Sequence, residues 1–239
     1  MQNGQNSRTA MLLGEPALAK LAGARIAIFG IGGVGGYVAE ALARAGVGAL
    51  DLIDNDTVSV SNINRQIIAL HSTVGRLKVD VMAERIRDIN PDCRVRALPT
   101  FYLPENATNF DFSAYDYIAD AIDTVSAKLD LAVRAHQAGV PIIAAMGAGN
   151  KLDATAFEVA DISKTSVCPL ARVMRIELRK RGINHMKVVY SREEPRTPKQ
   201  ASVSDAPAPR RSTPGSISYV PGSAGLIMAG EIIKDLIEI

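Results

Sequence analysis

Residues 25–36 of this chain read Arg25-Ile-Ala-Ile-Phe-Gly-Ile-Gly-Gly-Val-Gly-Gly36, an apolar run that leads straight into a group of glycines. The run Arg25–Gly30 predicts a strand that is buried on both of its faces, and Tyr37–Ala45 predicts the helix that follows. Residues without side chains let backbone N–H groups and a helix N-terminus approach a phosphate closely. The strand–loop–helix order therefore predicts a nucleotide-binding loop whose candidate residues are Gly30, Gly32, Gly33 and Gly35.

The alternation of strand and helix continues along the chain. Further strands are predicted at Leu50–Asp54, Arg94–Leu98, Tyr115–Ile122 and Val140–Met146. Helices are predicted at Val79–Ile89 and Val125–Ala138. Strands that alternate with helices build a parallel sheet covered on both faces. The predicted fold class is therefore α/β, with a Rossmann-like, doubly wound, mostly parallel sheet.

The pattern changes after Gly149, where strands and helices are appended to this core. The predicted additions are strands at Thr155–Ile162, Lys187–Ser191 and Ile217–Val220, a basic helix at Pro169–Arg181, and a closing helix after Pro221-Gly222. Arg192–Ser216 contains five prolines and no apolar periodicity, so we expect a mobile loop there. We expect one domain over residues 1–239, with a core at about 21–150 and a C-terminal extension at about 151–239.

Length, composition and cysteine usage narrow the class of protein. The 239 residues are 47% hydrophobic and 22% charged, with a net charge of +2, which is typical of a globular domain. Cys93 and Cys168 form no CxxC pair, so neither a disulfide framework nor a cysteine zinc site is expected. Met1–Thr9 lacks an apolar signal core, and no apolar run approaches the ~20 residues that cross a bilayer. We therefore expect a cytoplasmic protein without membrane segments.

A carboxylate ends the second predicted strand. Asp54 stands at about the spacing at which an acidic residue receives a ribose hydroxyl in nucleotide-binding folds. A glycine loop followed by an acid is compatible with NAD, FAD or ATP. At this point a dinucleotide oxidoreductase therefore remains an alternative to an ATP-dependent enzyme, and a tight turn that binds no ligand remains a third interpretation.

The polar segment after this strand favours ATP chemistry. Its candidate nucleotide-binding residues are Asp56, Asn62, Arg65, Gln66 and, twelve residues later, Lys78. A hydride-transfer enzyme needs no such set, because its pyrophosphate already lies on the glycine loop. A reaction at the α-phosphate does need it, since arginine and lysine offset the charge that grows in the transition state. We therefore expect catalytic roles for Arg65 and Lys78.

Asp120-Ala-Ile-Asp123 supplies two carboxylates near the end of the fourth predicted strand. Open α/β sheets place their ligands at this edge, and a carboxylate there can hold Mg²⁺ against a triphosphate. We assign this metal-binding and catalytic role to Asp123. Asp120 faces the other way if the strand is regular. Asp123 is also a candidate N-cap for the helix Val125–Ala138.

Together these motifs resemble the ubiquitin-activating and ThiF/MoeB superfamily. The resemblance rests on Gly-x-Gly-Gly-Val-Gly from Gly30, Asp54-x-Asp56, Ser61-Asn62-x-Asn64-Arg65-Gln66, Lys78 and Asp120-x-x-Asp123. It implies ribose binding by Asp54, phosphate binding by Arg65 and Lys78, magnesium binding by Asp123, and a phosphate pocket shaped by Asn62 and Gln66. It also implies a homodimer in which Arg8 reaches the ATP of the neighbouring subunit.

Within this superfamily the chain resembles the family of bacterial tRNA threonylcarbamoyladenosine dehydratases over nearly its whole length. The finer matches are Gly75, Met82-Ala-Glu-Arg-Ile, Ile89-Asn-Pro91, Asp161-Ile-x-Lys164-Thr165, Pro169-Leu-Ala, Val188-Val-Tyr-Ser191 and Gly215-Ser-Ile-Ser218. The resemblance implies that ATP adenylates the carboxylate of threonylcarbamoyladenosine at position 37 of tRNA, and that the carbamoyl nitrogen then closes a cyclic hydantoin with release of AMP and pyrophosphate. The implied ligands are ATP, Mg²⁺ and the modified tRNA.

The predicted basic helix offers a surface for tRNA. Arg172, Arg175 and Arg179 recur at i, i+3 and i+7, which puts them on one face. Such a stripe can contact phosphates, although charged helix faces are usually only solvated. Given the family resemblance, this helix and the loop Arg192–Ser216 are the expected tRNA surface.

Two other functions remain as alternatives. The first is an adenylyltransferase that activates the C-terminus of a ubiquitin-like sulfur carrier, and the missing CxxC pairs count against it. A sulfur-transfer protein is retained as a candidate partner, with Cys168 beside Pro169 as the one notable thiol, although Val188-Val189 stand where some dehydratases carry a cysteine. The second is a non-catalytic scaffold, which is disfavoured because the candidate phosphate and magnesium residues are all present.

Overall fold

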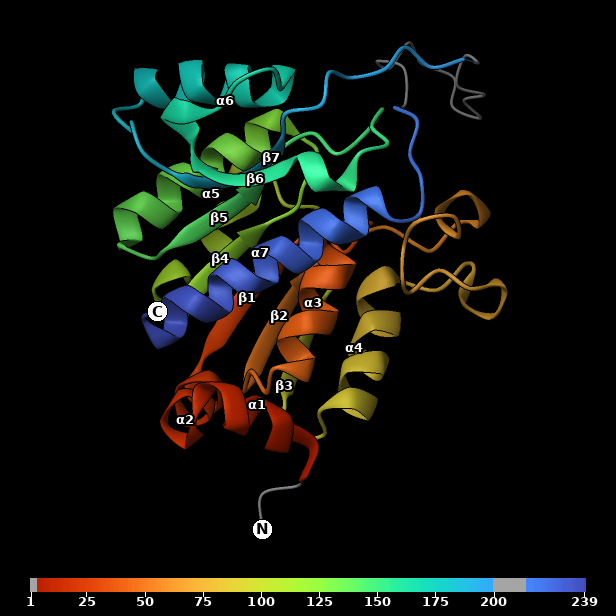
Figure 1. The fold of residues 1–239 in the computed structure, drawn as a ribbon, viewed down its shortest axis with the longest axis vertical. Coiled ribbons are helices and arrows are strands. Elements are labelled where there is room, and N and C mark those ends of the chain that lie inside the picture. The colour runs from red at the N-terminus through yellow and green to blue at the C-terminus, as the bar shows by residue number, and fades with distance from the viewer. Residues whose placement is uncertain (1–3, 200–213) are drawn as a thin grey trace.

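The computed structural model describes residues 4–199 and 214–239 and shows an α/β fold built around one sheet (Figure 1). The strand order is β3-β2-β1-β4-β5-β7-β6. The strands are β1 (Arg25–Phe29), β2 (Ala49–Ile53), β3 (Arg94–Leu98), β4 (Tyr117–Asp120), β5 (Ile142–Ala145), β6 (Phe157–Asp161) and β7 (Lys187–Ser191). Neighbouring strands are parallel except β6 and β7, which are antiparallel. The prediction of a Rossmann-like, mostly parallel sheet is confirmed.

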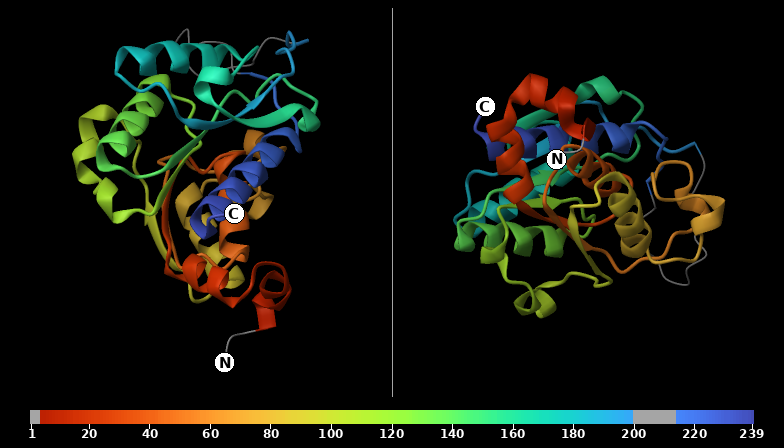
Figure 2. Two further views of the ribbon diagram at one scale, coloured as in Figure 1. Left: turned by 60° about the vertical axis from the view of Figure 1, so that its left-hand side comes forward. Right: turned by 90° about the horizontal axis from the view of Figure 1, so that it is seen from below.

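Helices cover both faces of this sheet (Figure 2). They are α1 (Ser7–Leu13), α2 (Glu15–Gly23), α3 (Gly35–Arg44), α4 (Lys78–Ile89), α5 (Val125–Ala138), α6 (Pro169–Lys180) and α7 (Val220–Ile237). α3, α4 and α7 pack on one face through apolar side chains such as Leu42 and Met228. α5 and α6 pack together on the other through residues such as Leu129 and Met174. None of the described helices is long and apolar enough to cross a bilayer.

Three parallel strands end at the same level and so define one edge of the sheet. Phe29, the last residue of β1, is in register with Ile53 of β2 and with Asp120 of β4. The segments that follow these strands therefore leave the sheet at a common edge, here called the carboxyl edge, and the opposite one is the amino edge. Parallel α/β sheets bind their ligands at the carboxyl edge, so the residues that follow β1, β2 and β4 are brought together there.

The last helix supports the glycine loop by close backbone contact. A Cβ atom on Gly225 of α7 would lie 2.4 Å from the carbonyl oxygen of Val34, so no side chain fits at this crossing. A Cβ atom on Gly33 would lie 3.1 Å from the Cβ atom of Pro221. The segment between β1 and α3 is thus packed against the first turns of α7.

Most predicted elements coincide with observed ones. Arg94–Leu98, Val125–Ala138 and Lys187–Ser191 match β3, α5 and β7 residue for residue, and the bounds of most others differ by one or two residues. Gly139 has a left-handed φ of 68° and ends α5, as glycine after a helix commonly does. Local stop signals of this kind explain why the bounds could be predicted.

The C-terminal part differs from the prediction in one element. The strand predicted at Ile217–Val220 is wrong, because residues 214–219 are in no strand or helix and α7 already begins at Val220. Pro221 explains the difference, since proline is favoured in the first turn of a helix. Within the predicted loop Arg192–Ser216, residues 192–199 and 214–216 have no regular structure, and residues 200–213 lie outside the described part of the chain.

Candidate nucleotide-binding site

The glycine loop is held by backbone contacts that leave no space for side chains. Gly30 has a φ of +89°, and its N–H donates to the Ile53 carbonyl at 2.8 Å. A Cβ atom on Gly30 would lie 2.7 Å from the Ala121 carbonyl oxygen, and one on Gly35 would lie 1.8 Å from the Gly30 carbonyl oxygen. Because α3 begins at Gly35, its first backbone N–H groups face this loop, which is the arrangement that binds phosphate.

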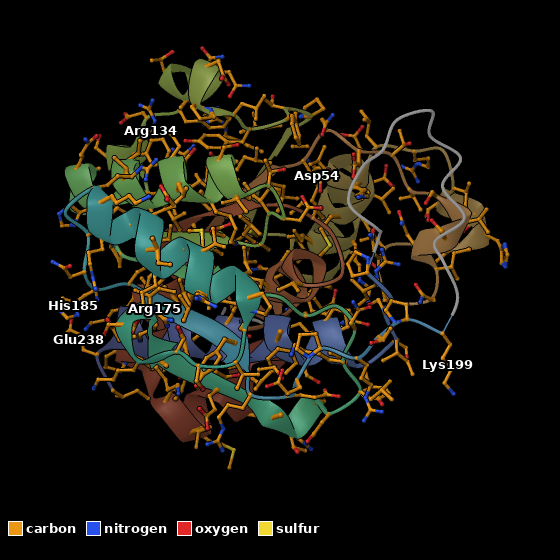
Figure 3. The ribbon with its side chains drawn as sticks, turned by 90° about the horizontal axis from the view of Figure 1, so that it is seen from above. Asp54, Arg134, Arg175, His185, Lys199 and Glu238 are labelled. Carbon is orange, nitrogen blue, oxygen red and sulfur yellow. The ribbon has the colours of Figure 1, made fainter. Side chains whose placement is uncertain are left out.

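Asp54 ties the end of β2 to the glycine loop (Figure 3). Its Oδ2 accepts a hydrogen bond from the backbone N–H of Ile31 at 2.7 Å, and its Oδ1 accepts one from the N–H of Asp56 at 2.8 Å. A carboxylate offers about four lone-pair sites, so acceptor capacity remains for a ribose hydroxyl. The predicted ribose-binding residue thus also fixes the loop, a second role that spacing alone did not reveal.

Lys78 reaches the carboxyl edge from the first residue of α4. An antiparallel bridge between Thr57 and Leu77 folds the intervening segment back, and the N–H of Lys78 donates to the Asp56 carbonyl at 3.0 Å. The Lys78 ammonium is buried and lies 2.7 Å from Asp56 Oδ2. A cation at a helix N-terminus is disfavoured by the helix dipole. Asp56 supplies the compensating charge.

Arg65 is a half-buried cation without a carboxylate partner. Its Nη1 donates to the Ser61 carbonyl at 3.0 Å and to Asn64 Oδ1 at 2.9 Å. Burial lowers the pKa of its guanidinium, and no carboxylate in the described residues forms an ion pair with it. A Cβ atom on Gly33 would lie 3.5 Å from Arg65 Cγ, so the side chain packs beside the glycine loop. Since a guanidinium keeps its charge in proteins, this position suits an anionic ligand such as phosphate.

Two amide side chains complete this segment. Asn62 Oδ1 accepts from the backbone N–H of Ser59 at 3.1 Å and so closes the short 3₁₀ helix Val60–Asn62. Gln66 is buried, and its Oε1 has no hydrogen-bond partner among the described residues. A Cβ atom on Gly32 would lie 3.8 Å from Gln66 Nε2, which places this amide against the glycine loop. An unpaired buried acceptor costs about 1–3 kcal/mol, so a ligand or water donor is expected there.

The two carboxylates after β4 have different surroundings. Asp120 is fully buried, and its Oδ2 lies 2.9 Å from the equally buried ammonium of Lys128. Burial raises the pKa of the Asp120 carboxyl, and the Lys128 charge offsets part of this rise. Asp123 is exposed in the loop that follows the strand, where its Oδ1 accepts from the Thr124 hydroxyl at 3.5 Å. Of the two, Asp123 is the one that a ligand can reach.

The N-cap interpretation of Asp123 is wrong. Thr124 occupies the N-cap position of α5, and its side chain makes no capping bond. β4 ends at Asp120, two residues before the predicted end at Ile122, so Asp123 stands in the loop that follows the strand. The strand is shorter than its apolar run, and the residue after it, Ala121, lies against the glycine loop, since a Cβ atom on Gly30 would lie 2.7 Å from its carbonyl oxygen.

Arg8 lies far from these residues within its own chain. It is on α1, which sits below the amino edge at the end of the molecule opposite the glycine loop (Figure 1). Met11 and Leu12 are 88% and 83% exposed and stand at i+3 and i+4 from Arg8, so the three residues share one helix face. The chain does not bring Arg8 to its own nucleotide-binding loop.

Neither cysteine is exposed. Cys168 is the N-cap of α6, and a Cβ atom on Gly147 would lie 3.7 Å from its Sγ. Cys93 is buried on the other side of the domain, and burial raises the pKa of its thiol to about 11. Among the described residues, no group of three or more His, Cys, Asp or Glu side chains could hold a metal ion.

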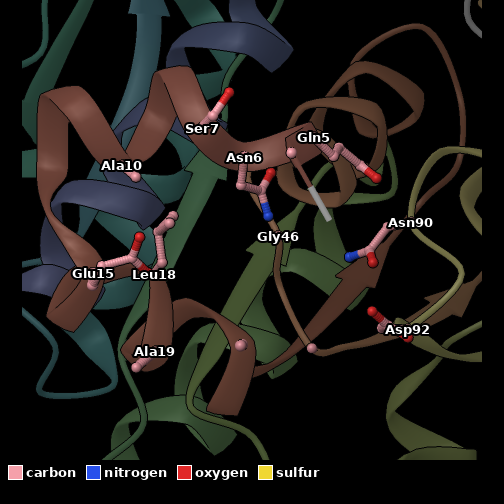
Figure 4. A pocket seen from close by; sticks show the side chains of 13 residues that line it. Gln5, Asn6, Ser7, Ala10, Glu15, Leu18, Ala19, Gly46, Asn90 and Asp92 are labelled. Carbon is pink, nitrogen blue, oxygen red and sulfur yellow. The ribbon is translucent and has the colours of Figure 1, made fainter. Parts of the chain in front are cut away.

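A cavity of about 480 Å³ lies at the amino edge (Figure 4). It is lined by the residues before and within α1 and α2, together with the turns at Gly46 and Asn90. None of the carboxyl-edge residues described above contributes to it. The groups that can bind phosphate lie at the carboxyl edge and do not line this cavity. The candidate nucleotide-binding site is therefore at the carboxyl edge and not in this cavity.

The basic helix α6 presents fewer cations than its spacing predicts. Arg172, Arg179 and Lys180 are exposed. Arg175 instead donates from Nη1 to the Thr165 carbonyl and to the Thr165 hydroxyl, both at 2.7 Å, and so holds the turn before the helix (Figure 3). The expected stripe of three arginines is therefore reduced to two that are available to a partner.

The chain is similar to one protein family and to solved structures that hold a nucleotide. The model of the ThiF family matches residues 6–239. A tRNA threonylcarbamoyladenosine dehydratase from Bacillus subtilis is 44% identical over 98% of this chain and 95% of its own length. The solved structure of Escherichia coli tRNA N6-threonylcarbamoyladenosine dehydratase in complex with ATP has a TM-score of 0.88 at 37% identity and covers 98% of this chain and 94% of that chain. The same enzyme in complex with AMP gives a TM-score of 0.86 at 38% identity, over 97% and 93%.

Proposed function

The chain belongs to the ThiF family, and we propose that it is an ATP-dependent tRNA threonylcarbamoyladenosine dehydratase. The observation that carries this function is the arrangement at the carboxyl edge, where a glycine loop without room for side chains lies beside Arg65, a half-buried cation that has no carboxylate partner among residues 4–199 and 214–239. The relatives that share nearly the whole chain support the choice of substrate. An enzyme that acts on tRNA would work in the cytoplasm.

The proposed reaction activates a carboxylate and then closes a ring. A threonyl carboxylate oxygen attacks the α-phosphorus of ATP, the bond to the bridging oxygen breaks, and pyrophosphate leaves with that electron pair. The carbamoyl nitrogen then attacks the acyl-adenylate carbonyl, gives up its proton and expels AMP. One carboxylate oxygen ends in AMP, so the nucleoside loses one water. Because closure is intramolecular, holding the two ends together contributes strongly to its rate.

Arg65 and Lys78 are the proposed stabilisers of charge at the α-phosphate. Both cations are at least half buried, so solvent screens their attraction to phosphate only weakly. The Asp56 carboxylate that pairs with Lys78 is 63% exposed, so its side chain can rotate away from Lys78 toward the solvent when a phosphate group binds to Lys78. The remaining proposed contacts to the nucleotide come from Gly30, Gly32, Gly33, Gly35, Asp54, Asn62 and Gln66.

Mg²⁺ is the proposed metal, with Asp123 as its protein ligand. Mg²⁺ usually binds one or two carboxylates and completes its octahedron with substrate phosphates and waters. The donor set fits this pattern, because Asp123 is exposed at the carboxyl edge whereas the neighbouring Asp120 is closed off by Lys128. When bound, Mg²⁺ would neutralise part of the charge of the triphosphate.

We extend the proposal to a homodimer in which Arg8 serves the nucleotide of the partner subunit. The face of α1 that carries Arg8 also exposes Met11 and Leu12, and adjoining exposed apolar side chains mark interaction surfaces. Arg8 lies at the opposite edge of its own chain from the glycine loop, so any contact with ATP would be made across a subunit interface.

The exposed side of α6 is the proposed tRNA surface. Lys180 and Arg181 pair with Glu177 at 2.6 and 2.8 Å, whereas Arg172 and Arg179 form no ion pair within the described residues. Exposed arginines without acidic partners are suited to phosphate contacts, which supply most of the affinity for nucleic acid.

The activation of a ubiquitin-like sulfur carrier is the second candidate function and is not favoured. The relatives that match nearly the whole chain at 36% identity or more are named as tRNA dehydratases. Cys168 is also buried, so it offers no exposed thiol to a sulfur-transfer partner. We therefore leave such a partner out of the proposed function.

We expect the protein to remove one water from threonylcarbamoyladenosine in tRNA when ATP and Mg²⁺ are present. The tRNA would be digested to nucleosides and weighed by mass spectrometry, with AMP measured in parallel and ATP omitted as the control. A product lighter by one water supports the function. Exchange of pyrophosphate into ATP that occurs only with an added ubiquitin-like carrier protein would instead favour the second candidate.

Substitution of Asp123 by alanine is expected to lower AMP formation by on the order of 100-fold or more, because a metal ligand that offsets transition-state charge is lost. The thermal unfolding midpoint should stay near that of the parent protein, because the side chain is exposed and makes one weak contact. Asp88→Ala, on the exposed side of α4, is the matched control. Turnover of Asp123→Ala close to that of the control would refute the metal-binding role.

Mixed dimers test the role of Arg8 in trans. Arg8→Ala and Asp123→Ala homodimers should each be inactive, since every site lacks one of the two groups. A mixed dimer has one complete site, because the intact Arg8 of one subunit reaches the intact Asp123 site of the other. When equal amounts of the two variants are refolded together, random pairing makes about half of the dimers mixed, so about a quarter of the activity of the parent protein should return. No recovery, with subunit exchange verified by tagged subunits, would show that Arg8 does not act across an interface.

Reversal of charge at Arg172 and Arg179 is expected to weaken tRNA binding by about tenfold at low salt. The slope of the logarithm of the binding constant against the logarithm of the salt concentration should also become shallower, by the amount expected for the loss of about two phosphate contacts. ATP binding should be unchanged, because α6 does not reach the glycine loop. The control is Arg87→Glu with Arg94→Glu, which makes the same change in net charge at the amino edge. Equal loss of tRNA affinity in both double variants would mean that only net charge matters.

A further inference from the structure

A buried ion pair lies next to the proposed metal ligand and has no role in the mechanism above. Lys128 and Asp120 are both fully buried, with Nζ and Oδ2 2.9 Å apart. A buried pair of this kind is weak evidence for stability, because desolvation can cost more than the attraction returns. Lys128 also stands about one turn from the start of α5, where the helix dipole disfavours a cation. Such a violation of a local preference points to a function.

The pair holds both backbone polar groups of one loop residue. Lys128 Nζ donates to the carbonyl of Ile122 at 3.2 Å, and Asp120 Oδ1 accepts from the N–H of Ile122 at 3.2 Å. Ile122 immediately precedes Asp123 in the chain. The two buried charges therefore fix the peptide units on both sides of Ile122, and with them the point from which the Asp123 side chain departs.

The other side of this loop rests on the glycine loop. The N–H of Ala121 donates to the Phe29 carbonyl at 2.8 Å, and a Cβ atom on Gly30 would lie 2.7 Å from the Ala121 carbonyl oxygen. Residues 121–123 are thus held between the nucleotide-binding loop on one side and the ion pair on the other. A shift of this loop would change the separation of the proposed metal ligand from the proposed phosphate site.

We propose that Lys128 and Asp120 are positioning residues that set the distance between Asp123 and the phosphates of the bound nucleotide. This inference rests on the proposed function. Neither residue touches the nucleotide, and each acts through the backbone of Ile122. Loss of the pair should therefore affect the steps that use Mg²⁺ more than nucleotide binding itself.

The test is Lys128→Met, which keeps the length of the side chain and removes its charge and its bond to Ile122. The Mg²⁺ concentration for half-maximal AMP formation should rise about tenfold or more, in line with the loss of groups that orient a metal ligand. The dissociation constant for ATP without Mg²⁺ should change by less than about threefold. Hydrogen exchange of the peptide that contains Ile122 and Asp123 should become faster.

A second variant separates positioning from folding. Lys128→Met leaves Asp120 buried without a partner, which can prevent folding. The double variant Asp120→Leu/Lys128→Met removes both charges and both bonds to Ile122, and it is expected to fold while keeping the raised Mg²⁺ requirement. Lys187→Met, which breaks the 2.7 Å pair with Asp235 at the amino edge, is the matched control and should keep the Mg²⁺ requirement of the parent protein.

The outcomes distinguish this inference from the proposed function. If the folded double variant has the Mg²⁺ requirement of the parent protein, the pair is only structural and the inference fails. If the parent protein makes no AMP from ATP and modified tRNA, the proposed function fails instead. In that case hydrogen exchange still decides the point, because unchanged protection of Ile122 in the folded double variant would refute the role of the pair in holding the loop.

Discussion

The contact between Gly30 and the carbonyl of Ala121 is the constraint on which the rest of the site depends. A side chain at Gly30 would overlap that carbonyl, so the loops after β1 and β4 can lie against each other only as bare backbone. Asp54 then fastens the end of β2 to the same place through the N–H of Ile31. The loops that follow the three parallel strands β1, β2 and β4 are therefore in contact at one edge of the sheet. The backbone fixes the distances between the candidate ligand-binding groups on these loops before a ligand binds.

The polar and charged side chains at this edge are arranged in a way that favours the binding of an anion. Within the described part of the chain, Arg65 is half buried and has no carboxylate partner, the buried Oε1 of Gln66 has no hydrogen-bond partner, and Lys78 pairs with Asp56, which is exposed to solvent. Each arrangement costs stability in the free protein, because desolvated polar groups are not fully paired. Residues that are unfavourable for folding but favourable for binding phosphate are what an adenylation site requires.

The sequence predicted the sheet better than it predicted the contacts that the candidate residues make. The glycine loop and Asp54 could be found because short motifs between a strand and a helix leave few structures open. Arg175 could not be assigned correctly, since helical spacing predicts a helix face but not that the guanidinium bonds to Thr165 in the turn before the helix. Lys128 was missed for a related reason: nothing in its neighbourhood marks it as buried, and its partner Asp120 becomes visible only when β4 and α5 are packed.

The packing of α7 on the segment between β1 and α3 has a consequence for how the protein is made. Gly225 and Pro221 support Val34 and Gly33, so the earliest strand–helix unit is completed by the last helix. Contacts between such distant segments form late, because loop closure costs entropy before the contacts repay it. The phosphate-binding loop therefore reaches its described packing only when α7 is in place, long after β1 and α3 have been synthesised.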